Sequence, residues 1–289
     1  MPHPIRTLAG TVAALLQRWL ADTSIERPQQ IAAPAVDVAL ERVTGTRDFL
    51  PCSWLLEGAK AADAVAQLRK GRGPVGTGFL ISPWLLLTNH HVLPQPQDAS
   101  TAVAVFRYAA DDDNRITQAC ELRLAPARCF VTSPVDDLDY TLVALAPLAD
   151  GRAPGAVFGS LPARAATTVP EPGEPVNIIQ HPAGRPQEIA VRNNKVIDDD
   201  SADYLSYETD SEPGSSGSPV LNDEWELVAL HSRSEFRSRA GQGSSAQVEW
   251  VANKGIRIAA IVADLVARTG SLGPEATALI NEALAGPPD

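Results

Sequence analysis

Apolar side chains recur at helical spacing toward both ends of the chain. Residues 5–21 place their large apolar side chains on one helical face, and similar spacing continues over about 35–44 and 53–69. Residues 256–268 and 275–285 repeat the pattern near the C-terminus. An amphipathic helix buries its apolar stripe, so we expect helices in these segments to cover or extend a central domain.

Between these regions the apolar runs are short and are separated by Gly, Pro and Ser, which is typical of β strands and turns. The runs GFLI and WLLLT flank Ser82 and Pro83 and predict a hairpin. An alternating run at 101–108 and an apolar run at 140–145 predict two further strands. Beyond a Pro-, Ala- and Gly-rich segment at about 146–175, strands are predicted in the runs PVNIIQ, YLSYET, SPVL, ELVALHS and VEWVA.

These patterns divide the chain into three parts. We expect a helical N-terminal extension over residues 1–71, a mostly β domain over 72–270 and a helical tail over 271–289. The subdivisions of the domain are a first β region at about 72–150, a linker at about 146–175, a second β region at about 176–255 and a helix at 256–268. The helix predicted at 5–21 must bury its apolar stripe on this domain or on a partner.

Composition and charge exclude several other classes of protein. The 289 residues are 44% hydrophobic and 20% charged, close to the average of soluble globular chains and unlike a disordered or coiled-coil sequence. The 24 Lys and Arg against 35 Asp and Glu give a formal net charge of −11, which is unfavourable for contact with nucleic-acid phosphates. We therefore expect a folded protein that binds no nucleic acid.

The N-terminal apolar stretch does not have the form of an export signal. It runs from Leu8 to Leu16 and is interrupted by Gln17 and Arg18, which favours an amphipathic helix over a cleaved signal peptide. No later run approaches the ~20 apolar residues that span a bilayer. Three cysteines do not form a disulfide framework. We expect a cytoplasmic protein without a membrane partner.

Three short segments carry the residue types of a nucleophilic hydrolase. The predicted hairpin leads to His90 and His91, Asp139 precedes the strand YTLVAL, and the turn GSSGSP contains Ser216. A serine hydroxyl needs a base to take its proton, a histidine titrates in a suitable range, and a buried carboxylate orients the histidine. Each segment alone also fits an ordinary turn or strand end. Their order, with each at a predicted strand boundary, matches a chymotrypsin-type triad.

The three motifs resemble those of bacterial trypsin-like serine peptidases of the chymotrypsin fold, nearest to the V8-like branch of glutamyl endopeptidases. TNHHV resembles the family's histidine motif, DYTLVAL its aspartate strand and GSSGSP its nucleophile motif. The resemblance selects His91 as base, Asp139 as orienting carboxylate and Ser216 as nucleophile. It covers about residues 75–265 and implies a mostly β fold of two antiparallel six-stranded Greek-key β-barrels (chymotrypsin-like), with a helical N-terminal extension and C-terminal helices.

The nucleophile motif also implies an oxyanion hole, formed by the backbone N–H groups of Gly214 and Ser216. Trypsins carry an aspartate just before the nucleophile, which pairs with the new N-terminus after zymogen cleavage. Here that residue is Ser215, so this ion pair cannot form. The reaction needs no metal or cofactor, and the acidic runs Asp111–Asp113 and Asp198–Asp200 lack the spacing of a calcium loop.

The resemblance gives conflicting clues to the substrate pocket. Asp210, six residues before the nucleophile, occupies the pocket-base position and would favour Arg or Lys before the scissile bond. His231 matches the histidine with which glutamyl endopeptidases bind an acidic side chain, and Ser211 their polar pocket position; His231 equally fits a buried core histidine. Because an anionic base opposes an acidic substrate, we favour basic specificity. The remaining pocket-strand residues are Ser232, expected to bond the triad aspartate, and Ser234.

The function expected from these motifs is endopeptidase cleavage of protein or peptide substrates through an acyl-enzyme on a serine. Among the residues that precede the peptidase motifs, the run ERVTGTRDFLPCSWLLEGAKAADAVAQLRKG (41–71) resembles a leader found before bacterial trypsin-like peptidase domains, some of which are encoded with conflict or defence systems. Residues 1–70 are expected either to cover the peptidase core or to dock a regulatory protein partner. The alternative function is a peptide-binding module that keeps the cleft without cleaving; the intact triad favours the enzyme.

Overall fold

The structure is a computed structural model that describes residues 49–71, 73–116, 118–191, 193–198, 201–239 and 247–286. From Lys60 onward the chain forms one compact unit. The helices predicted at 5–21 and 35–44, and with them most of the predicted docking segment, lie outside the described residues.

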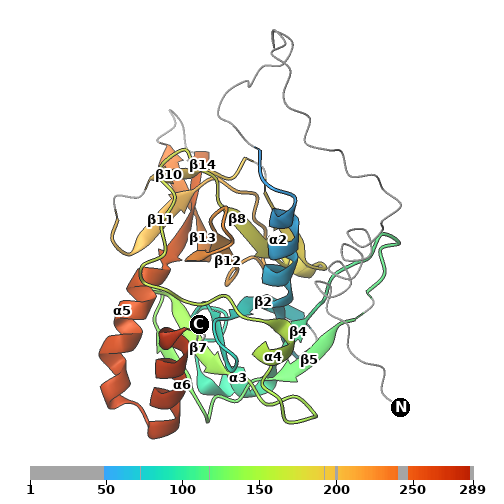
Figure 1. Ribbon diagram of the computed structural model, residues 1–289. Helices are drawn as coiled ribbons and strands as arrows, with labels where there is room; N and C mark the ends of the chain where they lie inside the picture. Colours follow the sequence, from blue (N-terminus) through green and yellow to red (C-terminus); the bar gives the residue numbers. More distant parts are fainter. Residues whose placement is uncertain are drawn as a thin grey trace, which may run out of the picture. The chain divides into compact units, whose positions relative to one another are not determined.

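Two antiparallel sheets of seven strands each make up most of this unit. The first has the order β5-β4-β1-β2-β3-β7-β6, with β1 (Val65–Lys70), β2 (Gly73–Leu80), β3 (Leu85–Thr88), β4 (Ala102–Phe106), β5 (Cys120–Arg123), β6 (Phe130–Ser133) and β7 (Tyr140–Ala144). The second has the order β10-β11-β14-β13-β12-β8-β9, with β8 (Asn177–Gln180), β9 (Glu188–Ala190), β10 (Val196–Asp198), β11 (Tyr204–Tyr207), β12 (Pro219–Leu221), β13 (Leu227–Arg239) and β14 (Gln247–Arg257). Figure 1 shows the second sheet in yellow and orange above the first in cyan and green. The predicted pair of antiparallel β regions is confirmed, with seven strands in each sheet in place of the expected six.

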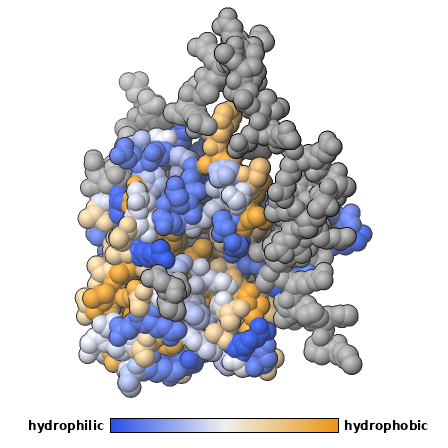
Figure 2. Space-filling model, in the orientation of Figure 1, coloured by the Kyte–Doolittle hydropathy of each residue, from blue (hydrophilic) through white to orange (hydrophobic). Residues whose placement is uncertain are grey.

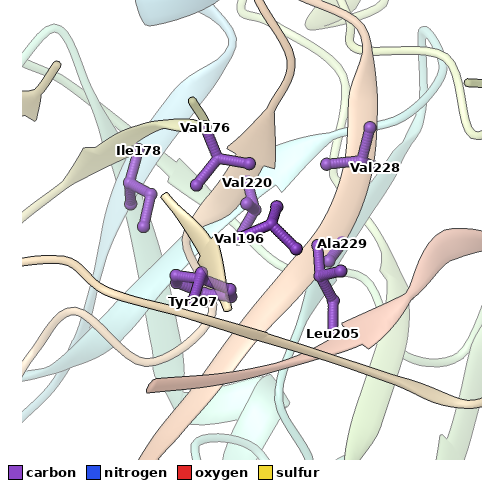
Figure 3. Packing of buried hydrophobic residues seen from close by; sticks show 8 residues of the cluster. All are labelled: Val176, Ile178, Val196, Leu205, Tyr207, Val220, Val228 and Ala229. Carbon is purple, nitrogen blue, oxygen red and sulfur yellow. The ribbon is translucent and has the colours of Figure 1, made fainter. Parts of the chain in front are cut away.

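Short bridges curve each sheet around its own core. Leu124, just after β5, pairs with Leu145, just after β7, and Pro175, before β8, pairs with Lys195, before β10. In the second sheet the apolar side chains of several strands point toward one another (Figure 3). This buried cluster consists of Val176, Ile178, Val196, Leu205, Tyr207, Val220, Val228 and Ala229. Removal of these side chains from water is the main favourable contribution to folding of this sheet.

The segment predicted as one helix at 53–69 divides into a helix and a central strand. α2 (Ser53–Asp63) is followed by β1, which begins at Val65. All residues from Val65 to Leu68 are buried, and β1 pairs with β2 on one side and β4 on the other. A short apolar run fits a helix or a strand, and here the two flanking strands supply the hydrogen bonds that select the strand. The first β region therefore begins inside the predicted extension, whose expected end is residue 71.

The predicted linker packs on the first sheet. It contains α4 (Gly155–Phe158), and Phe158 stacks on Phe106 of β4 with ring centroids 4.4 Å apart. The guanidinium of Arg107 lies 4.9 Å from the Phe158 ring centroid and forms a buried ion pair with Asp63, with Nε 3.2 Å from Oδ1. This part of the linker thus belongs to the core of the first sheet.

The remaining helices are short, apart from the C-terminal pair. They are α3 (Pro96–Thr101), η1 (Pro182–Gly184), α5 (Ile258–Arg268), η2 (Thr269–Ser271) and α6 (Pro274–Ala285). The C-terminal helices, which the sequence predicts, lie side by side in Figure 1. The Tyr140 hydroxyl of β7 donates to Asp264 Oδ2 of α5 at 2.6 Å, and Arg268 Nη1 donates to the Thr132 carbonyl at 3.0 Å. Because α5 follows β14, these bonds tie the second sheet to the first.

Every helix within the described residues is too short or too polar to span a lipid bilayer. On the face shown in Figure 2, apolar residues gather over α5 and α6 but are interspersed with hydrophilic ones. Among the exposed large apolar side chains of the described residues is Val266 of α5, which is 57% exposed.

Candidate active site

His91 and Asp139 meet because the strands that precede and follow them are paired. β3 ends shortly before His91, β7 begins directly after Asp139, and the two strands pair at the ends nearest these residues. The His91 Nδ1–H donates to the Asp139 carboxylate, with Nδ1 2.9 Å from Oδ2 and 3.1 Å from Oδ1. The neighbouring His90 lies instead beside Thr132, whose Oγ1 is 2.8 Å from His90 Nδ1. Of the two adjacent histidines, His91 is the one that Asp139 orients, and its side chain is 37% exposed.

The Asp139 carboxylate is buried and held in its ionised form by hydrogen bonds. Its side chain is 4% exposed, and it accepts the Ser232 hydroxyl at 2.6 Å in addition to His91. Burial raises the pKa of Asp139, but hydrogen bonds from His91 and Ser232 outweigh burial and lower the pKa below its usual value. Asn89 Nδ2 donates to the Asp139 carbonyl at 2.9 Å and supports a left-handed backbone (φ 42°) that Asp tolerates. This environment suits a carboxylate that orients a histidine and stabilises its positive charge.

Ser216 lies next to the second sheet, in the nucleophile turn (residues 212–217) before β12, and is connected to Asp139 through Ser232. The Ser232 hydroxyl donates to Asp139, while the Ser232 carbonyl accepts the Ser216 hydroxyl at 3.0 Å. Ser232 belongs to β13, so one strand contacts both of these predicted catalytic side chains. The Ser216 hydroxyl must rotate away from Ser232 to reach Nε2 of His91. Catalytic hydrogen bonds are commonly completed only when substrate binds.

Two glycines determine the backbone of the nucleophile turn. Gly214 has φ 104° and Gly217 has φ 88°, a region that residues with a Cβ rarely adopt. A Cβ on Gly214 would lie 2.7 Å from the His181 carbonyl oxygen, and one on Gly217 would lie 2.0 Å from the Thr77 carbonyl oxygen. Neither the Gly214 N–H nor the Ser216 N–H has an acceptor among the described residues. Both donors therefore remain for an oxyanion.

Ser215 forms its hydrogen bonds inside the same turn. It is buried, its hydroxyl oxygen accepts the Glu212 N–H at 3.2 Å, and its own N–H donates to the Glu212 carbonyl at 3.0 Å. The Glu212 carboxylate pairs in bidentate fashion with Arg185, with Nη1–Oε2 and Nη2–Oε1 distances of 2.8 and 3.2 Å. Ser215 stands where trypsins have the aspartate that pairs with the new N-terminus. Its hydroxyl and its N–H are bonded within the turn, so it needs no such ammonium partner.

Two of the predicted pocket serines converge on a buried asparagine. The Ser211 and Ser234 hydroxyls donate to Asn253 Oδ1 at 2.9 and 2.8 Å. Asn253 is fully buried, and its Nδ2 donates to the Thr209 carbonyl at 2.7 Å. Because both serine protons are used on the amide oxygen, the serine oxygens keep lone pairs for other donors.

The other two predicted specificity residues lie in contrasting environments. His231 is buried in the second sheet, where the Tyr207 hydroxyl lies 2.6 Å from its Nδ1. Burial, together with positive charge on His91, lowers the pKa of His231 to about 4, so its imidazole is neutral at pH 7. Asp210 is exposed, and its carbonyl accepts Gln180 Nε2 at 3.0 Å.

Asn253 and Tyr207 are absent from the sequence-based predictions. In the sequence each is only a residue with a polar group within a predicted strand, and such a residue is equally typical of an exposed strand edge. Their partners are known only once β11, β13 and β14 are aligned side by side.

Within the described ranges, no group of three or more His, Cys, Asp or Glu side chains could hold a metal ion.

Two antiparallel β sheets, with the histidine and aspartate on the first and the serine turn on the second, define a protein of chymotrypsin-like fold. Residues 76–230 match the family model described as a trypsin-like peptidase domain. The chain therefore belongs to the trypsin-like peptidase family, a family of serine proteases.

A curated relative and a solved fold are also similar to this chain. The relative is the uncharacterized protein y4fB of Sinorhizobium fredii (strain NBRC 101917 / NGR234), 33% identical over 299 residues that cover 92% of this chain. The match covers 45% of that relative, so the chain spans about half its length. Two structures of Rv3671c, a protease from M. tuberculosis H37Rv in its inactive form, give TM-scores of 0.47 and 0.48 at 18% and 15% identity. They cover 75% and 72% of this chain and 91% and 90% of theirs.

Proposed function

We propose that the chain is a serine endopeptidase in which Ser216, His91 and Asp139 form the catalytic triad. One observation carries this proposal. A hydrogen-bonded series runs from His91 through Asp139 and Ser232 to Ser216 and joins the two sheets. Turns and strand ends with a purely structural role do not require a nucleophile, a base and a buried carboxylate to lie together. Membership of the trypsin-like peptidase family supports the same reaction class.

In the proposed reaction, His91 Nε2 takes the proton of the Ser216 hydroxyl while Ser216 Oγ bonds to the carbonyl carbon of the scissile peptide. The carbonyl oxygen gains negative charge, and the N–H groups of Gly214 and Ser216 donate to it. His91 then gives its proton to the leaving amine as the C–N bond breaks, which leaves an acyl-enzyme. A water molecule deprotonated by His91 hydrolyses this ester. Asp139 holds the Nδ1–H of His91 throughout.

The edge of β13 beside Ser216 offers a place for the substrate backbone. β12 pairs with β13 only as far as Leu230, so among the described residues Ser232–Ser234 have no strand partner on that side. A peptide added there as a strand would donate an N–H to the Ser232 carbonyl. That bond competes with the Ser216 hydroxyl for the same oxygen, which favours rotation of the hydroxyl toward His91.

Reaction with a fluorophosphonate probe tests the proposed activity. The probe phosphonylates a serine that a base activates and whose oxyanion hole holds the phosphoryl oxygen, so we expect stoichiometric labelling at Ser216. Ser215 and Ser218 are buried and should stay unmodified, which makes them internal controls. Peptide mass spectrometry locates the adduct. A chain that neither reacts nor hydrolyses any member of a peptide library would instead be a peptide-binding module.

We further propose that the residue before the scissile bond is Arg or Lys, recognised by Asp210. The exposed Asp210 carboxylate has no cationic partner among the described residues. The hydroxyls of Ser211 and Ser234 offer neutral acceptors, and burial keeps His231 uncharged, so these groups add no positive charge for an acidic side chain. The alternative is the acidic preference of the V8-like branch. In that case His231 Nε2 would donate to the substrate carboxylate, because the Tyr207 hydroxyl is hydrogen-bonded to His231 Nδ1.

Exchange of Asp210 for serine is expected to remove the preference for Arg and Lys. The charge-assisted pair contributes roughly 1.5–3 kcal/mol, so kcat/KM for basic substrates should fall about 10- to 100-fold relative to neutral ones. Cleavage-site profiling of the wild type and the variant measures this ratio. Asp112→Ser, an equal loss of charge in an exposed turn, should leave the profile unchanged. A basic preference that survives Asp210→Ser, or an acidic preference in the wild type, would refute the assignment.

A further inference from the structure

Thr77 of β2 is hydrogen-bonded to the nucleophile turn at two separate peptide groups. Its N–H donates to the Ser216 carbonyl at 2.8 Å, and its hydroxyl donates to the Gly214 carbonyl, also at 2.8 Å. The same hydroxyl oxygen accepts the His181 N–H at 3.3 Å, and Thr77 is fully buried. One residue of the first sheet therefore joins the turn to the segment that follows β8 in the second sheet.

The peptide groups on both sides of Gly214 are held by donors from outside the turn. The Ala183 N–H donates to the Pro213 carbonyl at 2.7 Å, and the Thr77 hydroxyl holds the Gly214 carbonyl. The described peptides are all trans, and in a trans peptide the C=O and the N–H point in opposite directions. The bond to Pro213 therefore directs the Gly214 N–H away from Ala183. Rotation of either flanking peptide would break one of the two bonds.

Glycine at position 214 makes these outside bonds necessary. A glycine adopts φ 104° without steric cost, but it adopts negative φ as readily, so Gly214 itself imposes no preference for one orientation of its N–H. The ion pair that holds this turn in trypsins cannot form at Ser215. Thr77 can replace that support, because β2 is paired with β1 on one side and β3 on the other.

We propose that Thr77 is a positioning residue for the oxyanion hole, and that its hydroxyl keeps the Gly214 N–H directed at the carbonyl oxygen of the substrate. The inference rests on the proposed peptidase function. It assigns to a residue of the first sheet a role in positioning the proposed oxyanion hole, which lies in the nucleophile turn. Thr77 acts through Gly214 and does not itself contact the substrate. Its effect is greatest in the transition state, where the carbonyl oxygen carries the negative charge that the N–H stabilises.

Thr77→Val tests the role of the hydroxyl, because valine keeps the shape of the side chain and removes its hydrogen bonds. Loss of an oxyanion donor costs about 10²–10³-fold in kcat; we expect about 10- to 100-fold here, because the Ala183 bond still holds one peptide. KM should change by less than about threefold, since the oxyanion is absent from the ground state. Affinity for a peptidyl trifluoromethyl ketone, which forms an oxyanion in the hole, should fall in parallel with kcat/KM. Affinity for the cleaved product peptide should stay unchanged.

Two further variants separate positioning from general stability. Thr77→Ser keeps the hydroxyl and should restore kcat to within about threefold of the wild type. Thr141 is also fully buried and donates to a backbone carbonyl, that of Leu93 at 2.9 Å, outside the nucleophile turn. Thr141→Val should therefore lower the Tm as Thr77→Val does, with kcat within about twofold of the wild type. If Thr77→Val does not fold, Thr77→Ala, which also removes the hydroxyl, takes its place with the same expectations.

The outcomes distinguish this inference from the proposed function. If the wild type is active and Thr77→Val has the same kcat and the same affinity for the ketone, the role of Thr77 alone is overturned. The same holds if Thr77→Ser does not restore kcat, because the hydroxyl is then not the group that matters. A wild type that is neither labelled by a fluorophosphonate nor active on peptides overturns the proposed function, and this inference with it.

Discussion

Replacement of Ser216 by alanine is expected to lower kcat/KM for a peptide substrate by about 10⁶-fold and to abolish fluorophosphonate labelling. The alanine side chain has no oxygen to bond to the carbonyl carbon, so no acyl-enzyme can form. The Gly214 N–H and the strand edge of β13 are unaffected. A residual rate of about 10³-fold over water should therefore remain from the oxyanion hole and binding alone. Hydrolysis of one peptide identified by cleavage profiling measures the loss.

A matched variant shows whether the loss belongs to Ser216 or to the serine-rich motif as a whole. The Ser218 hydroxyl, two residues farther along GSSGSP, is buried and has no hydrogen-bond partner among the described residues. Removing an unpartnered hydroxyl leaves no other group unsatisfied, so Ser218→Ala should keep kcat/KM within about threefold of the wild type. Appreciable hydrolysis by Ser216→Ala, or a comparable loss in Ser218→Ala, would mean that the nucleophile is misassigned.

Asparagine in place of Asp139 is expected to lower kcat by about 10⁴-fold with little change in the overall fold. The carboxylate accepts three donors, the Nδ1–H and the backbone N–H of His91 and the Ser232 hydroxyl. An amide group offers one oxygen and one NH₂, so one of these donors would face another donor. The His91 tautomer with the proton on Nε2 would then be favoured, and that tautomer cannot take the proton of Ser216. The imidazolium would also lose its counter-charge.

Asp136→Asn is the control for this substitution. Asp136 is exposed and lies three residues earlier in the same DDLDY motif. Its substitution therefore removes an equal charge from the same segment. Its kcat should stay within about twofold of the wild type, as expected for an exposed surface substitution. Measurement of kcat together with the Tm separates a catalytic defect from unfolding. A folded Asp139→Asn protein with near-normal kcat would remove Asp139 from the proposed triad.

The sequence by itself determined the elements whose signal is local. The hairpin β2–β3, the strand β7 and the helices α5 and α6 follow from apolar periodicity bounded by turn residues. His91, Asp139 and Ser216 could be proposed as a set because each lies in a short motif at a strand boundary, in an order typical of the fold. The division of the chain into two β regions followed from proline and glycine composition near residues 146–175.

The tertiary structure decided the features that depend on residues distant in the chain. β1 is a strand because β2 and β4 flank it, although its own spacing also fits a helix. Ser232 joins Ser216 to Asp139, and Asn253 accepts the Ser211 and Ser234 hydroxyls, only after β13 lies against the first sheet and β14. Thr77 meets Gly214 from 137 positions away. Local patterns report backbone preference and burial, whereas a hydrogen bond between distant residues depends on how the sheets pack, and no local pattern records that.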